Sequence, residues 1–425
     1  MRDKNRTDDK MAGRRKILGI HPTVFSLGIV SFFTDVSSEM LVPIVPQFLK
    51  FVLGVSGTGI GIIEGIAEAT ASVLRVFAGY LADKFGRPKL LTVIGYGLSA
   101  VSKPFYIISH TMSQVLAIRF GDRLGKGIRS APRDVLIADA TEQADRGRAF
   151  GFHRAMDTAG ATLGPLVILL MVWWFARGLL PEQAGKDHRD LYKLVFIVAT
   201  IPAVIGWLVL VFFVPEHARE DGKAQAPKLS LAGFDKRFLV FLFIVTLFSA
   251  GNSSDAFLVL RARSAPVNMG FVGFLWVYVV FNALSAIVAL RSGILSDRIG
   301  RKPVIVVGWL VFSLVYFAMG RVSSPTGVWI WFVVYGAYYG MTDGMLRAFA
   351  VDLAPAHLRG TAVGAYYTFT GVALLPASII AGYLWDHVSH AAPFYYGSVT
   401  ALVSAVLLAF LVRSGSPAGA EQTIR

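Results

Sequence analysis

Twelve apolar segments of membrane-spanning length run through this 425-residue chain, and they limit its possible folds more than any other feature. A transmembrane helix needs about 20 mostly apolar residues, and these segments are close to that length. Hydrophobic residues make up 55% of the chain and charged residues only 16%. Because segments this long do not suit a β-barrel, we expect an all-α integral membrane protein. The predicted helices cover residues 23–49, 57–81, 90–109, 114–139, 148–174, 191–214, 238–262, 270–295, 303–321, 328–351, 360–385 and 393–413.

The positive charge of the chain, +14 in total, follows this predicted topology. Lys and Arg gather before the first segment and after the second, fourth, sixth and eighth, which are alternate loops on one side of the membrane. The positive-inside rule then places both termini in the cytoplasm, and we expect the bacterial inner membrane as the location. This distribution indicates a lipid bilayer, and not nucleic acid, as the partner.

Three blocks of sequence occur twice, in the same order and about 215 residues apart, as in a repeat protein. "DVSSEM" (35–40) matches "NSSDAF" (252–257), and "GYLADKFGRPK" (79–89) matches "GILSDRIGRK" (293–302). "ADATEQADRGRAFG" (138–151) matches "VDLAPAHLRGTAVG" (351–364). The chain is therefore expected to fold as two six-helix halves in parallel repeat. Its predicted parts are a cytoplasmic tail (1–22), a first bundle (23–214), a cytoplasmic linker (215–237), a second bundle (238–413) and a tail (414–425).

The loop repeat carries a family signature. Over essentially its whole length the chain resembles the major facilitator superfamily of secondary transporters, whose signature is G-x-L-A-D-x-x-G-R-K. The resemblance implies an alternating-access carrier in which each loop aspartate docks on the other half and stabilises one conformational state. Alternatively, the loops are only turns with a positive-inside anchor. The loop residues concerned are Gly79, Asp83, Gly86 and Arg87 in the first copy, and Gly293, Asp297, Gly300 and Arg301 in the second.

The segment 114–139 carries a charged stripe. At 100° per residue its charges fall within about 140° of arc. In a bilayer such a stripe must line a water-filled path or be neutralised by acids on neighbouring helices. The family resemblance implies that the first, fourth, seventh and tenth helices line a cavity, and that an arginine of the fourth takes part in proton transfer. The stripe consists of Arg119, Asp122, Arg123, Lys126, Arg129, Arg133 and Asp134.

Two acid pairs are the candidate partners of this stripe: Asp35 with Glu39, and Glu64 with Glu68. Each pair has i,i+4 spacing and so shares one helix face. We expect Glu39 near Arg123 or Lys126, where protonation of the carboxylate would release the cation. That arrangement would couple transport to protons. The alternative is a static ion-pair network.

The second half has fewer intramembrane charges, mainly Asp255, Asp343 and Arg347, which suggests that it serves substrate contacts. An aromatic cluster there is expected either to line a pocket or to pack the bundle. It consists of Trp276, Tyr278, Phe281, Tyr335, Tyr338, Tyr339, Tyr366 and Tyr367.

Gly151, Gly160, Gly164 and Pro165 match the family's antiporter motif, G-x8-G-x3-G-P, although its terminal Gly-Gly is absent. This motif favours export.

The sequence as a whole predicts a secondary transporter, not an enzyme, that exports a small organic solute in exchange for protons. One alternative is uptake of an anion, or of a metal ion or chelate such as an iron–siderophore. Another is a non-transporting receptor or scaffold on the same fold. Because no nucleotide-binding motif is supported, no cofactor is expected. The functional unit is expected to be a monomer.

Overall fold

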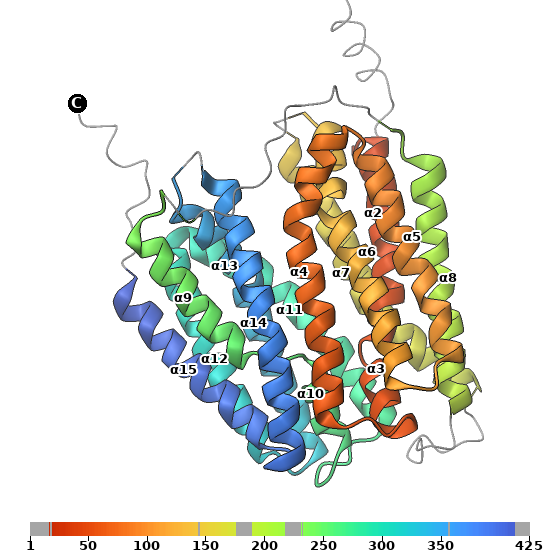
Figure 1. Ribbon diagram of the computed structural model, residues 1–425, viewed down its shortest axis with the longest axis vertical. Coiled ribbons are helices and arrows are strands. Elements are labelled where there is room, and N and C mark those ends of the chain that lie inside the picture. Colours follow the sequence, from red (N-terminus) through yellow and green to blue (C-terminus); the bar gives the residue numbers. More distant parts are fainter. Residues whose placement is uncertain are drawn as a thin grey trace, which may run out of the picture.

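The computed structural model describes residues 17, 19–142, 145–175, 189–216, 231, 233–355 and 358–412, without the side chains of 79–83, 85, 146, 147, 175 and 297. These residues form two helical bundles that lie side by side (Figure 1). The first bundle contains α2 (Pro22–Leu41), α3 (Val45–Gln47), η1 (Phe48–Val52), α4 (Gly57–Phe85), α5 (Pro88–Ser102), η2 (Lys103–Ile108), α6 (Met112–Asp139), α7 (Arg146–Phe175) and α8 (Arg189–Phe213). The second contains α9 (Lys236–Gly251), α10 (Ala256–Arg263), α11 (Phe271–Ile299), α12 (Arg301–Arg321), α13 (Pro325–Asp352), α14 (Arg359–His387) and α15 (Ala392–Leu411).

The predicted fold class is confirmed, because each of the twelve apolar segments corresponds to one helix or one broken helix. The broken ones are α2 with α3 and η1, α5 with η2, and α9 with α10. Among the described residues, nine spans are long and apolar enough to cross a membrane by composition alone. The three that fall short are α4, α6 and α13, which carry most of the predicted intramembrane charges. Such helices persist in a bilayer because their polar faces turn toward protein.

Local sequence signals explain where several helices begin and turn. A capping box formed by Thr111 and Gln114 starts α6. Gly86 and Gly300 have φ values of 60° and 87°, which suit glycine in the tight loops after α4 and α11. The two serine blocks differ in structure: the first lies inside continuous α2, whereas the second begins at Asn252, in the break between α9 and α10.

Glycines allow close contact between the two halves, where α4 packs on α14 and α7 on α11. Gly61 and Gly65 of α4 lie against the carbonyls of Ser378 and Leu375 on α14. Gly382 of α14 in turn lies against the first residue of α4, Gly57. Small residues let helix backbones approach closely, which is a main source of packing energy inside a bilayer.

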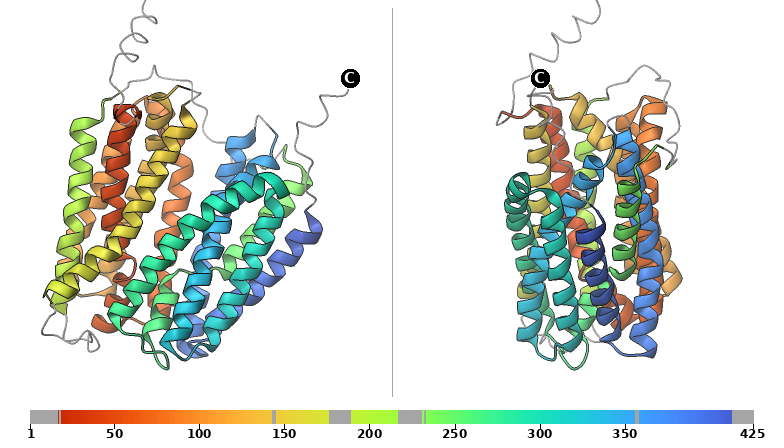
Figure 2. Two further views of the ribbon diagram at one scale, coloured as in Figure 1. Left: turned by 180° about the vertical axis from the view of Figure 1, so that it is seen from behind. Right: turned by 90° about the vertical axis from the view of Figure 1, so that its left-hand side faces the viewer.

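The start of α2 and the end of α15 lie at the same end of the molecule, where the two bundles are farthest apart (Figures 1 and 2). The bundles converge at the opposite end. At the converging end the Asp386 carboxylate of α14 accepts hydrogen bonds from the Gly57 and Thr58 backbone N–H groups, at 2.8 and 2.7 Å. The Thr58 hydroxyl adds a third bond at 2.8 Å. Arg263 Nε also donates to Gln47 Oε1 across the halves, at 2.9 Å. Asp386 therefore caps a helix that belongs to the other half, where negative charge is favoured.

Replacing Asp386 with alanine is expected to separate the halves at this end. The variant loses a charged helix cap with three hydrogen bonds, and removing a capping side chain costs about 0.5–2 kcal/mol in all. The chain contains no cysteine, so spin labels can be placed on cysteines introduced at exposed Ser113 and Ser323. The label-to-label distance distribution should shift to longer values in Asp386→Ala. The control, Thr111→Ala, removes a helix cap within one half and should leave it unchanged. An unchanged distribution in Asp386→Ala would mean that the cap does not hold the halves together.

Candidate functional site

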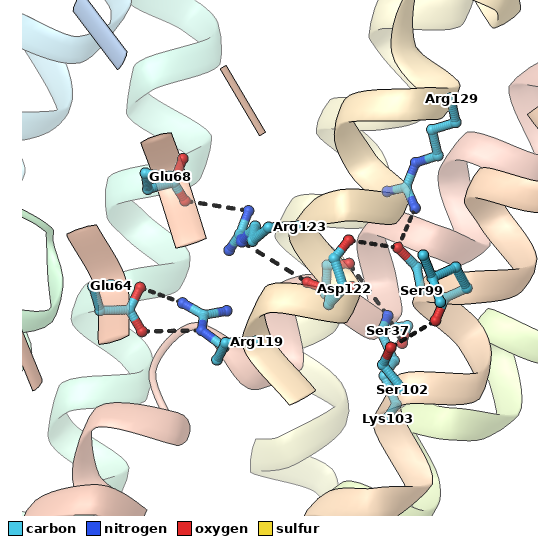
Figure 3. A network of polar contacts seen from close by, with 12 residues as sticks. Ser37, Glu64, Glu68, Ser99, Ser102, Lys103, Arg119, Asp122, Arg123 and Arg129 are labelled. Atoms are coloured by element: carbon cyan, nitrogen blue, oxygen red, sulfur yellow. Dashed lines mark hydrogen bonds and ion pairs between the residues drawn. The ribbon is translucent and has the colours of Figure 1, made fainter. Parts of the chain in front are cut away.

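Two ion pairs join α4 to α6 one helical turn apart (Figure 3). Arg119 binds Glu64 with two nitrogens, Nε at 3.0 Å from Oε1 and Nη2 against Oε2. Arg123 Nη1 lies 3.3 Å from Glu68 Oε1. The side chains of Arg119 and Glu64 are 6% and 4% exposed, so this pair is almost fully buried. Two predicted acids are thus brought together with two predicted cations by their matching i,i+4 spacing.

Two further arginines of the stripe face α5 and α2. Arg129 Nη1 donates to Ser99 Oγ at 2.7 Å, and its guanidinium lies 4.3 Å from the Tyr96 ring centre. Ser99 Oγ also donates to the Asp122 backbone carbonyl at 3.0 Å (Figure 3). Arg133 binds the Asp134 carboxylate at 3.0 Å and the hydroxyl of Ser31 on α2 at 3.3 Å. The stripe is therefore divided among three neighbouring helices.

Glu39 lies within electrostatic range of Arg123 and Lys126, as expected, but it makes no ion pair with either. Glu39 Oε2 instead accepts a hydrogen bond from Tyr278 Oη of α11, at 2.9 Å, and so joins the two halves. The reason is that Glu68 is the ion-pair partner of Arg123 on the neighbouring helix. Within the part of the chain that the structure describes, the side chains of Lys126 and Asp35 make no hydrogen bond or ion pair.

Three cations have unused hydrogen-bond donors and lie near the contact between α4 and α6, which we call the α4–α6 seam. The Nε atoms of Arg75 and Arg123 are buried and have no hydrogen-bond acceptor among the described residues. The Arg75 guanidinium lies 4.4 Å from the ring centre of Tyr367, on α14 of the other half. Lys126 lies within electrostatic range of Arg75, Arg123 and Glu68. Arg123 Nε does lie 3.8 Å from the Asp122 carboxylate, which is an ion-pair distance. The seam therefore holds four cations beside three ion-paired acids, Glu64, Glu68 and Asp122.

The antiporter-like motif packs α7 against α2 beside the two acids of α2. A side chain at Gly160 would meet the Phe32 carbonyl and the Asp35 Cβ, and one at Gly164 would meet the Val36 carbonyl and the Glu39 Cβ. Pro165 follows within α7. Gly151, by contrast, has open space where its Cβ would be. Only part of the motif is therefore a close helix contact.

The polar residues of the second half form two separate groups. Asp255 accepts a hydrogen bond from Tyr335 at 2.7 Å. Asp343 lies 3.1 Å from Arg347 and 3.4 Å from Arg154 of the first half, and Arg347 also donates to Tyr367 at 3.1 Å. Most of the predicted aromatic cluster is packed ring against ring, whereas Trp276 is exposed and Tyr366 contacts Tyr367 in a pair of its own.

The loop signatures are placed only in part. The surroundings of Gly79 and the side chains of Asp83 and Asp297 lie outside the described part of the structure, so docking of the loop aspartates stays a prediction. Arg301 binds the Asp352 carboxylate and the Ala348 carbonyl, at 2.5 and 2.7 Å. Arg301 belongs to the repeated block 293–302 and Asp352 to the repeated block 351–364, so this contact joins two blocks of the second half. Arg87 is exposed and Gly293 has open space beside it.

One buried cation was not predicted from the sequence. Lys103, at the start of η2, is 1% exposed, and its Nζ donates to Ser37 and Ser38 of α2. The first serine block therefore binds a lysine of a neighbouring helix. A lysine inside an apolar segment is costly enough to have served as a signal.

Comparisons with known proteins agree with this architecture. A family model described as Major Facilitator Superfamily matches residues 27–375 and 268–424. An uncharacterized MFS-type transporter of Methanocaldococcus jannaschii is 34% identical, over 91% of this chain and 94% of its own length. The cis,cis-muconate transport protein of Acinetobacter baylyi is 23% identical, over 86% of this chain and 89% of its own length.

Among solved structures, a mutant of the nucleoside transporter NupG is similar with a TM-score of 0.74 and 15% identity, over 92% of this chain and 98% of that one. The peptide transporter POT in complex with sulfate has a TM-score of 0.74 and 13% identity, over 93% and 95% of the two chains. At this identity the structures establish the shared fold alone, whereas the family model and the archaeal relative establish the family. The chain belongs to the Major Facilitator Superfamily of membrane transporters.

Proposed function

We propose that this protein is a proton-coupled carrier of a small organic anion. The observation that carries this proposal is the excess positive charge on α4 and α6, where four cations lie beside three ion-paired acids. The cations are Arg75, Arg119, Arg123 and Lys126, and the acids are Glu64, Glu68 and Asp122. A buried cation with unused donors is costly unless an anion binds it. A carboxylate would accept charge-assisted bonds from these donors.

Asp35 and Glu39 are the proposed proton acceptors. They lie one turn apart on α2 and have no cationic ion-pair partner in the described part of the chain. Both lie within electrostatic range of Lys126. Protonation of either acid would leave Lys126 less neutralised, and the site would then hold an anion more tightly. Proton and anion loading would therefore support each other, which favours symport.

Two relatives support this substrate class by their names. One is the cis,cis-muconate transport protein of Acinetobacter baylyi. The other is a probable 4-methylmuconolactone transporter of Cupriavidus pinatubonensis, 24% identical over 80% of this chain. By contrast, a site for a hard metal cation would need several converging oxygen ligands. Here Glu64 and Glu68 face arginines instead. With cytoplasmic termini in a bacterial inner membrane, symport would bring the anion into the cell.

Proton-coupled export of an organic solute is the second candidate. It is favoured by the contacts of Gly160 and Gly164 with α2 beside Asp35 and Glu39. In an exchanger of this kind, protons and solute would compete for the same acids. A cationic or neutral solute would then be expected.

Transport in proteoliposomes separates the two candidates. We expect an inward proton gradient to drive uptake of radiolabelled cis,cis-muconate or another small carboxylate, and a protonophore to abolish it. Tetraphenylphosphonium, a lipophilic cation, should not be moved. Proton-driven export of this cation without carboxylate transport would instead support the exchanger and overturn the anion proposal.

A further inference from the structure

Lys103 is a cation whose surroundings suit an uncharged amine. Its side chain is 1% exposed and lies where η2 contacts α2 and α8. Ser37 Oγ donates its single hydrogen to the Ala199 carbonyl of α8, so toward Lys103 it acts only as an acceptor. Ser38 Oγ is the second acceptor, at 3.3 Å. No carboxylate of the described residues lies within ion-pair distance of Nζ.

Counting donors favours the neutral form in this conformation. A neutral amine has two N–H donors, and the two serines accept both of them. Its lone pair has no donor among the described residues, but leaving it unpaired costs less than leaving an N–H of a charged group unpaired. An ammonium has three donors, and the third has no acceptor among the described residues. Burying an ammonium that has no carboxylate at ion-pair distance is also costly.

The second half of the chain provides an internal comparison. Ser253 stands in the second serine block where Ser37 stands in the first, and Tyr316 lies on the third helix of its half, as Lys103 does in the first. Tyr316 has Ser253 as a side-chain hydrogen-bond partner. A neutral phenol therefore fills, in one half, the place that an amine fills in the other. Packing at this position requires a hydrogen bond but no charge.

The charged neighbours of Lys103 belong to the proposed coupling site. They are Asp35 on α2 and Asp122, Arg123 and Arg129 on α6, and α8 contributes only the Ala199 carbonyl. We propose that the Lys103 amine takes up and releases a proton during transport, and that Ser37 and Ser38 hold its uncharged form in the conformation seen here. Only an N–H bond forms and breaks in this step. The proposal deepens the proton-coupled function proposed above and rests on it.

Arginine at position 103 is the sharpest test, because it keeps a cation but holds its proton at every accessible pH. We expect Lys103→Arg and Lys103→Met to flatten the pH profile of transport and to lose proton-driven accumulation, while both retain exchange of labelled for unlabelled solute. The matched control is Tyr316→Phe, which removes the hydroxyl at the equivalent place and should keep the wild-type pH profile. A wild-type profile and accumulation in Lys103→Arg would overturn the proposal.

A second measurement does not depend on transport. In purified protein with ¹⁵N-labelled lysine, a neutral-amine Nζ signal should be present and should vanish in Lys103→Arg. If the wild-type protein shows no proton-driven transport of any anion but this signal is present, the proposed function fails while the uncharged state of Lys103 stands. An ammonium signal from Lys103 throughout the range from pH 6 to pH 9 would overturn the inference for Lys103 alone.

Discussion

Replacing Arg119 with leucine is expected to destabilise the protein by about 3–5 kcal/mol, the usual cost of removing one partner of a buried ion pair. Glu64 would lose both hydrogen bonds from the guanidinium while remaining 4% exposed. Insertion into the membrane should be unaffected, because α6 would lose a charge and gain apolar surface. The measurement is the free energy of unfolding in detergent or lipid bicelles, or the shift of the melting temperature.

The double variant Arg119→Leu with Glu64→Met is the matched control. Replacing a whole buried pair by apolar residues of similar volume is often neutral, so most of the lost stability should return. Arg237→Leu, at an exposed pair with Asp235, should change stability by less than about 1 kcal/mol. A loss below about 1 kcal/mol in Arg119→Leu would show that the pair does not support the fold.

Replacing Lys126 with glutamine is expected to remove most anion transport while leaving the fold intact. No ion pair of the described residues is broken, because Lys126 has none. If its ammonium binds the substrate anion, the loss of one charge-assisted bond of about 1.5–3 kcal/mol weakens substrate binding about 10-fold to 150-fold. The measurement is the KM for anion uptake in proteoliposomes, together with thermal stability.

Lys126→Arg should restore part of the affinity, because it keeps the charge but changes the hydrogen-bond geometry. Lys193→Gln, in an exposed pair with Asp190 on α8, should leave transport unchanged. An unchanged KM in Lys126→Gln would exclude Lys126 as the anion ligand. Lower stability with an unchanged KM would indicate a structural role.

The sequence predicted site residues best where the spacing of charges along a single helix was enough to place them on one face. The charges of α6 and the i,i+4 acids of α4 are read directly from 3.6-residue periodicity, and the two helices do meet through Glu64–Arg119 and Glu68–Arg123. Periodicity gives the face of a helix but not which neighbour it meets. For that reason the sequence places Glu39 near Arg123 or Lys126, and only the structure shows that its hydrogen-bond partner is Tyr278 of the other half.

Sequence alone determined that this chain is an all-α membrane protein of two repeated halves, because segment length, apolar content and an internal repeat are properties of the chain itself. Only the tertiary structure decided which charges cancel and which stay unmatched. Pairing depends on side chains from α2, α4, α5 and α6 that lie far apart in sequence and meet only through packing. The contact of Lys103 with Ser37, 66 residues away, is of this kind.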